Sequence, residues 1–115
     1  MLNISIQINL NSNLNVVSAE LERAIEATLE TIGLYVSSEA KVRTPVDTGL
    51  LRSSIHHIVD LQKKKVEVGT NVSYAEIIEV GSSTRTPQPY LVPAVEENIQ
   101  NINRLAKSTF EQFGQ

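Results

Sequence analysis

The 115-residue chain contains no cysteine, and only 4% of its residues are aromatic. Without cysteine it can form neither disulfides nor thiolate zinc sites, and it has no cysteine nucleophile. Hydrophobic residues nevertheless make up 41% of the chain, so we expect a core built from Ile, Leu, Val and Ala. A chain of this length buries roughly two-thirds of its unfolded surface, which is enough for one modest core. We therefore expect a single domain spanning residues 1–115.

Excess positive charge and long apolar runs are also missing. The formal net charge is −3, whereas a protein that grips nucleic acid through its phosphates usually has a basic face. Uninterrupted apolar stretches do not exceed two or three residues, and no basic segment followed by an apolar run begins the chain. We therefore expect no sequence-specific nucleic-acid partner, no membrane partner and no signal peptide, and a protein made in the cytoplasm.

The residues that usually carry chemistry are few and scattered. His56 and His57 are adjacent, and neighbours on a strand point to opposite faces, so they cannot easily serve one metal or one active site. Asp47 lies in a Pro/Gly turn and the chain has no G-x-S-x-G motif, so an Asx-type hydrogen bond explains it better than a hydrolytic triad. We expect no catalytic residue, no metal site and no cofactor.

Charged side chains gather in two places whose role the sequence leaves open. Glu22, Glu26 and Glu30 recur at helical spacing, where like charges repel by a few tenths of a kcal/mol. They indicate either a solvated face or a face that meets a basic partner or lines a DNA channel. The run of three lysines at 63–65 is either a solubilising turn or a contact with a partner or phosphate.

Hydrophobic periodicity predicts the elements of the first half. Residues 2–10 alternate apolar and polar and predict a half-buried strand, while residues 16–43 follow the spacing of a helix. A helix of this length either overhangs a compact domain or breaks, and Gly33 is the expected place of a break, because glycine is costly in a helix interior. Pro45 ends the helix. Residues 54–61 and 65–70 predict a β-hairpin.

The second half predicts a short helix, a loop and a C-terminal helix. Residues 73–76 have capping-box spacing and open the short helix, which Gly81 closes. Residues 82–92 predict a polar, extended loop, and Pro93 begins the last helix. The fold class is therefore α+β: a long N-terminal helix and a C-terminal helix packed on a small antiparallel sheet of about three to four strands, plus one short helix.

The loop at residues 82–92 is longer than most connections, and such loops are often functional. Pro87 and Pro89 hold it extended, which limits the entropy lost when it docks. Arg and Tyr are enriched among interface hot spots, so we expect Arg85 and Tyr90 to anchor the loop on another chain.

Two blocks of residues resemble the minor structural protein family of tailed bacteriophages that acts in tail completion and head–tail joining. The first block, residues 44–55, is similar to the family's Pro-x-Asp-Thr-Gly-x-Leu-Arg-x-Ser-Ile block after a long helix. The second, residues 68–94, is similar to its Tyr-Ala, Glu-x-Gly and Pro-x-Pro-aromatic-Leu-x-Pro-Ala series, with Ser82 where the family often has threonine. The residues that carry this resemblance are Pro45, Asp47, Thr48, Gly49, Leu51, Arg52, Ser54, Tyr74, Glu79, Gly81, Pro87, Pro89, Tyr90 and Pro93.

The resemblance implies a structural protein without catalysis, present in the host cytoplasm during assembly and then in the virion. Its partners would be other phage connector or tail proteins, together with further copies in a ring at the head–tail connector or tail end. The turn at residues 45–49 would redirect the chain from helix to sheet, with a positive φ at Gly49. Arg52 would bond helix-end carbonyls or pair with Glu79. The departure angle of the loop would be set by Tyr74, Glu79 and Gly81.

Two other classes remain open from the sequence. A small regulatory binding module, such as an antitoxin or adaptor, fits the size and charge and predicts one defined protein partner without a ring. A small hydrolase would need a pocket around His56 or His57.

Overall fold

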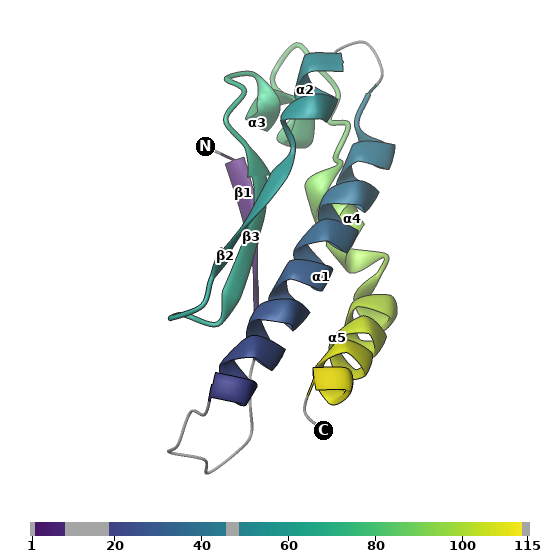
Figure 1. The fold of residues 1–115 in the computed structure, drawn as a ribbon. Coiled ribbons are helices and arrows are strands. Elements are labelled where there is room, and N and C mark those ends of the chain that lie inside the picture. The colour runs from purple at the N-terminus through teal and green to yellow at the C-terminus, as the bar shows by residue number, and fades with distance from the viewer. Residues whose placement is uncertain (1, 9–18, 46–48, 114–115) are drawn as a thin grey trace.

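The computed structural model describes residues 2–8, 19–45 and 49–113, which form the expected α+β fold. The long helix lies across one face of a three-stranded antiparallel sheet, and the C-terminal helix packs along the long helix (Figure 1). The molecule is elongated, with extents of 52 × 23 × 22 Å. The elements are β1 (Leu2–Gln7), α1 (Ala19–Arg43), α2 (Gly49–Ser54), β2 (His56–Asp60), β3 (Lys65–Thr70), α3 (Ala75–Val80), α4 (Leu91–Glu96) and α5 (Ile99–Phe113).

The sheet has the strand order β1-β3-β2, and it carries the alternation that the sequence predicted for its first strand. Ile4 of β1 pairs with Val68 of β3, and Ile6 pairs with Val66. Both valines are fully buried in the central strand. Because side chains alternate along a strand, this register places the apolar residues of β1 and β3 on the face that the helices cover.

Helix α1 runs without interruption through Gly33, so the expected break there is wrong. A Cβ atom at Gly33 would lie 2.6 Å from the ring Cδ2 of His57 and 2.8 Å from Cγ2 of Val66. The glycine therefore lets the helix approach the sheet closely. Close packing against the sheet requires glycine at this position, although glycine has a low helix propensity. At 1.5 Å per residue the 25-residue helix is ~37 Å long, which accounts for much of the elongated shape.

Helix α2 extends from the end of the turn expected at residues 45–49 to the start of the strand expected at residues 54–61, where no helix was expected. Gly49 is its first residue, and Leu51 is fully buried. The expected positive φ at Gly49 is wrong: among the described glycines Gly81 has that conformation, and a Cβ at Gly49 would meet nothing within 4 Å. Asp47 and Thr48 lie outside the described residues.

The C-terminal region contains two helices instead of one helix from Pro93. Pro93 lies in the first turn of α4, where its missing N–H is tolerated. Asn98 separates α4 from α5: its Nδ2 donates to the carbonyl of Ala94 at 3.0 Å, and its Oδ1 accepts from the hydroxyl of Tyr35 at 2.7 Å. This buried amide thus ties the junction of the two helices to α1.

Replacing Gly33 tests the close contact between helix and sheet. We expect Gly33→Ala to destabilise the protein by about 1–3 kcal/mol through overpacking, although alanine is the better helix former. Gly49→Ala is the matched control, because its new methyl group meets open space, and it should be neutral or slightly stabilising. Chemical denaturation of both variants measures the difference, and a Gly33→Ala variant as stable as the wild type would contradict it.

Candidate interaction site

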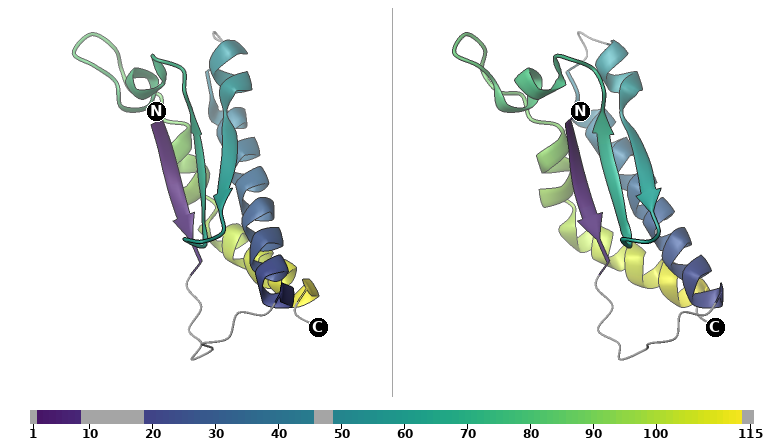
Figure 2. Two further views of the ribbon diagram at one scale, coloured as in Figure 1. Left: turned by 60° about the vertical axis from the view of Figure 1, so that its left-hand side comes forward. Right: turned by 90° about the vertical axis from the view of Figure 1, so that its left-hand side faces the viewer.

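The segment between α3 and α4 extends away from the body of the molecule (Figure 2). We call residues 81–90 the projecting loop. Residues 82–89 are exposed throughout. Within the loop, Ser82 and Arg85 form a tight turn in which the N–H of Ser82 donates to the carbonyl of Arg85 at 2.9 Å. The loop therefore has a defined turn of its own, and most of its residues are accessible to solvent.

The carboxylate of Glu79 fixes the end of the projecting loop. Glu79 is only 6% exposed, and its Oε1 accepts hydrogen bonds from the backbone N–H groups of Tyr90 at 3.0 Å and Leu91 at 2.8 Å. Its Oε2 accepts a third, from Val92 at 3.2 Å. These donors lie at the start of α4, where N–H groups lack partners within the helix and favour negative charge. Glu79 thus caps α4 from another element.

The start of the projecting loop is held by Gly81. This residue has φ +78°, and a Cβ there would lie 2.8 Å from the carbonyl oxygen of Arg85 and from the ring of Pro87. Its N–H donates to the carbonyl of Ile77 at 2.8 Å, which ends α3 as the sequence predicted. The N–H of Gln88 donates to the carbonyl of Ile78 at 2.8 Å. Both ends of the loop are therefore attached to α3.

The start of α3 differs from the capping box expected at residues 73–76. Tyr74 is the N-cap residue, and its side chain makes no capping hydrogen bond. The backbone N–H of Ala75 donates to the carbonyl of Val72 at 3.1 Å. A tight backbone turn thus precedes this short helix in place of a serine cap.

Tyr90 belongs to the core, so its expected role as an exposed interface anchor is wrong. Its side chain is 0% exposed, and its hydroxyl donates to the carbonyl of Ala75 at 2.9 Å. Burial raises the pKa of Tyr90, and the negative charge of Glu79 raises it further. The spacing of Tyr90, Leu91 and Ala94 places them on one face of a helix, and this pattern in the sequence could have predicted the burial of Tyr90. All three residues are buried in the structure.

Arg85, Pro87 and Pro89 remain exposed, in keeping with an interaction role for the loop. The guanidinium Nη2 of Arg85 donates to Oε1 of Gln88 at 3.0 Å, within the loop itself. This neighbouring contact holds the arginine at the surface without burying it. Of the two side chains expected as anchors, Arg85 is therefore the one that the fold leaves accessible.

The first sequence block connects α1 to the sheet through α2. Pro45 follows the end of α1 and is half-buried. Ser54 ends α2, and its Oγ lies 2.6 Å from the hydroxyl of Thr70 in β3. Arg52 is exposed, and the expected pairing with Glu79 is wrong, because the buried carboxylate is occupied by backbone donors.

The two histidines make separate contacts. Nε2 of His57 lies 2.8 Å from Oε2 of Glu30 on α1, and Nδ1 of His56 lies 2.9 Å from the carbonyl oxygen of Ser54. Across residues 2–8, 19–45 and 49–113, no group of three or more His, Asp or Glu side chains could hold a metal ion.

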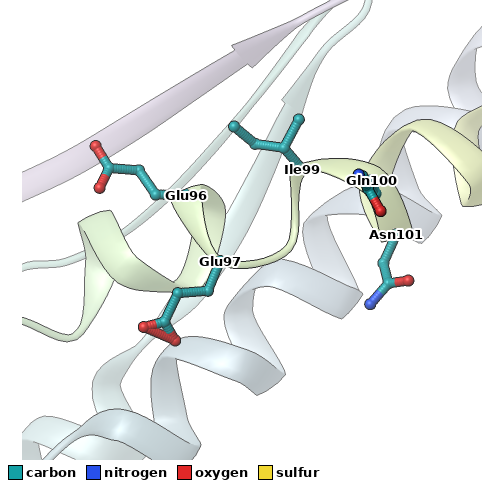
Figure 3. Close-up of a pocket in the computed structure, with 5 residues that line it drawn as sticks. All are labelled: Glu96, Glu97, Ile99, Gln100 and Asn101. Atoms are coloured by element: carbon teal, nitrogen blue, oxygen red, sulfur yellow. The ribbon is translucent and has the colours of Figure 1, made fainter.

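The hollow at the junction of α4 and α5 has a volume of about 400 Å³ and is lined by Glu96, Glu97, Ile99, Gln100 and Asn101. Figure 3 shows that Glu96 and Glu97 extend to different sides of the chain. Oε1 of Glu97 accepts from Nη2 of Arg43 at 2.8 Å, and Nδ2 of Asn101 donates to the hydroxyl of Tyr35 at 3.2 Å. These groups tie the C-terminal helices to α1 and do not converge on a common point.

Residues 9–81, more than half of the chain, match the family HK97-gp10_like, described as "Bacteriophage HK97-gp10, putative tail-component". The chain belongs to this family. It is the phage minor structural protein family of tail completion and head–tail joining that the two sequence blocks resemble. The match ends at Gly81, so most of the projecting loop lies beyond it.

No curated protein matches the chain, and no solved structure does. No helix in the described part of this tail component is long and apolar enough to cross a lipid bilayer.

Removing the carboxylate of Glu79 tests the attachment of the loop. We expect Glu79→Ala to destabilise the protein by about 2–4 kcal/mol, because it leaves buried backbone donors without an acceptor. Glu76→Gln is the matched control on the same helix, since Glu76 is exposed, and it should change stability by less than about 0.5 kcal/mol. Urea denaturation gives both values, and equal midpoints for the two variants would show that the carboxylate is not structural.

Burial of the Tyr90 hydroxyl predicts a pH dependence. The folded-state pKa lies above the ordinary value of 10.0, so the unfolded chain loses this proton first. The contribution of Tyr90 is thus intact below about pH 10 and is lost as the pH rises beyond it. We expect Tyr90→Phe to cost about 1–3 kcal/mol at pH 7 through the unpaired Ala75 carbonyl.

Stability measured from pH 7 to 11.5 should fall less steeply for Tyr90→Phe than for the wild type. The variant keeps Tyr35 and Tyr74, so the two proteins differ only in the hydroxyl of Tyr90. Parallel curves would mean that Tyr90 ionises freely in the folded protein.

Proposed function

We propose that this tail component is a non-enzymatic ring subunit, which assembles with further copies at the head–tail connector or the tail end of the virion. The observation that carries the proposal is the projecting loop. Residues 82–89 of this loop are exposed, and both ends of the loop are hydrogen-bonded to α3. The family of the chain supports the structural role.

A loop held in this way loses little conformational entropy when it docks. Gly81 and Glu79 fix its ends, and Pro87 and Pro89 restrict its backbone. The free energy of any contact is then available for association and is not consumed by ordering the loop. A subunit that occupies a fixed place among many copies needs such a preformed surface.

The partners in this proposal are other phage connector or tail proteins and further copies of the chain. The protein would fold in the host cytoplasm and end in the virion. Glu97 and Asn101, which line the hollow at the α4–α5 junction, make structural contacts with Arg43 and Tyr35 of α1, in keeping with a role without catalysis. A regulatory module with one defined partner would instead leave the virion without this chain.

Altering the loop should impair assembly without impairing folding. The test variant combines Arg85→Ala with Pro87→Gly and Pro89→Gly, which removes an exposed guanidinium and raises the entropy cost of docking. We expect the yield of joined head–tail particles to fall several-fold while the thermal midpoint stays near that of the wild type. Lys107→Ala, on the exposed face of α5, is the control that should change neither.

Cryo-microscopy of the particles gives the second measurement for this proposal. Several copies arranged around the tail axis are expected. A virion that lacks the chain, or holds one isolated copy, would refute the ring. A loop variant whose yield falls only in proportion to its stability would mean that the loop is a plain connection.

A further inference from the structure

We infer that the free protein forms a two-fold symmetric dimer, in which the β1 strands of two copies pair with each other in antiparallel orientation. The two three-stranded sheets then form one continuous sheet, with the two β1 strands at its centre. This contact does not rest on the proposed ring, because an isologous contact joins two copies and does not repeat. It concerns the free protein, whereas the ring concerns the virion.

The side of β1 that faces away from β3 carries backbone groups without partners. The N–H of Ile8 donates to the carbonyl of Lys64 at 2.9 Å, and along an antiparallel pair the residues that exchange hydrogen bonds alternate with those that do not. The register of β1 and β3 therefore turns the backbone groups of Asn3, Ser5 and Gln7 away from β3. Within the described residues no hydrogen bond reaches these N–H and carbonyl groups. They are spaced to pair with an extended strand.

β1 also lacks the features that protect edge strands in most proteins. Charged side chains, proline and bulges discourage pairing at the edge of a sheet. β1 contains no charged residue and no proline, and its register with β3 runs without a bulge from Leu2 to Gln7. The other edge strand, β2, includes His56, His57 and Asp60. Figure 2 shows β1 at the border of the sheet, with α3 and the projecting loop beyond its N-terminal end. β1 is therefore the edge that is suited to strand pairing.

The sequence of β1 matches itself in antiparallel orientation, which indicates a second copy as the partner. When Ser5 faces Ser5 of the second copy, Asn3 faces Gln7, and all the outward-facing backbone groups of both strands are paired. Ile4 then lies opposite Ile6, on the face that the helices cover. A shift of two residues would carry Asn3 or Gln7 beyond the end of the other strand. This register thus pairs polar with polar and apolar with apolar side chains, and no like charges meet.

A hollow beside the end of β1 is placed to receive side chains of the added strand. It has a volume of about 350 Å³ and is lined by apolar side chains from the sheet and the helices: Ile6, Ile8, Ile32, Ile102 and Ala106. Its other lining residues, Gln7 and Asn103, are uncharged. The apolar side chains of β1 are only partly buried, whereas the valines of the central strand are fully buried. In the two-fold register, Leu2 and Ile4 of the second copy lie opposite Ile8 and Ile6 and cover this hollow.

The dimer should be weak and reversible. Its contact consists of one pair of short strands and the two hollows beside them, and small contact areas are typical of transient complexes. We therefore expect the dimer population to rise with protein concentration. A contact of this strength can dissociate when copies enter a particle.

Sedimentation equilibrium over a range of concentrations measures the dimer, and Ser5→Lys is the disrupting variant. It places two like charges directly opposite each other at the two-fold axis, which should raise the dissociation constant by about fivefold or more. Within one copy the new ammonium group lies beside Glu67, the β3 partner of Ser5, so the monomer should keep its thermal midpoint. Ser5→Thr is the matched control, since it keeps a short hydroxyl side chain in the strand, and it should dimerise like the wild type.

A mixture of Ser5→Lys and Ser5→Glu tests the two-fold register. The side chain of Ser5 is exposed, so both variants should fold. Opposite charges face each other at the axis in the mixed dimer alone, and the mixture should therefore contain more dimer than either variant by itself. Equal dimer populations in the three samples would overturn the pairing of β1 with β1.

Hydrogen exchange locates the contact. The amides of Asn3, Ser5 and Gln7 should exchange more slowly as the concentration of the wild type rises, while the amides of β2, the other edge strand, exchange alike throughout. A protein that stays monomeric at every concentration would overturn the inference, and so would a dimer that leaves the β1 amides unprotected. Either result leaves the proposed ring in place, because the ring is measured in virions.

Discussion

The hydrogen bonds from three backbone N–H groups to the buried carboxylate of Glu79 fix the start of α4 and the end of the projecting loop. A buried carboxylate is costly unless its oxygens are paired, and the start of a helix supplies the donors that it needs. These hydrogen bonds therefore satisfy both the carboxylate oxygens and the backbone N–H groups. It sets where α4 begins, how the projecting loop returns, and where Tyr90 enters the core. The conformation of the exposed loop thus depends on the hydrogen bonds of a buried residue, Glu79.

The rest of the molecule is organised along α1. Its length gives the molecule its elongated shape, and Gly33 lets it lie close to β2 and β3. On its other side, Tyr35 and Arg43 contact Asn98 and Glu97 at the junction of α4 and α5. The long helix therefore packs against the sheet on one side and against the C-terminal helices on the other. Such an arrangement keeps the two ends of the molecule in a fixed relation.

This architecture suits a protein that acts through its surfaces. Glu97 and Asn101 at the α4–α5 junction bond to α1, and the two histidines bond to α1 and to the end of α2. Exposed large apolar side chains are distributed over α1, α2, β2, α3, α4 and α5, and the projecting loop extends from one end of the molecule (Figure 2).

The sequence by itself determined the elements whose residues repeat regularly, and the family. Alternation predicted β1, three-and-four spacing predicted α1, and the two motif blocks identified the phage family. Tertiary structure alone decided α2, the hydrogen-bond partner of the Tyr90 hydroxyl and the role of Glu79. A helix of six residues is too short for its periodicity to be read, and the partners of Tyr90 and Glu79 lie 11 to 15 residues away. Local pattern reports neighbours within one or two turns, whereas burial and capping across elements depend on contacts that exist only once the chain has folded.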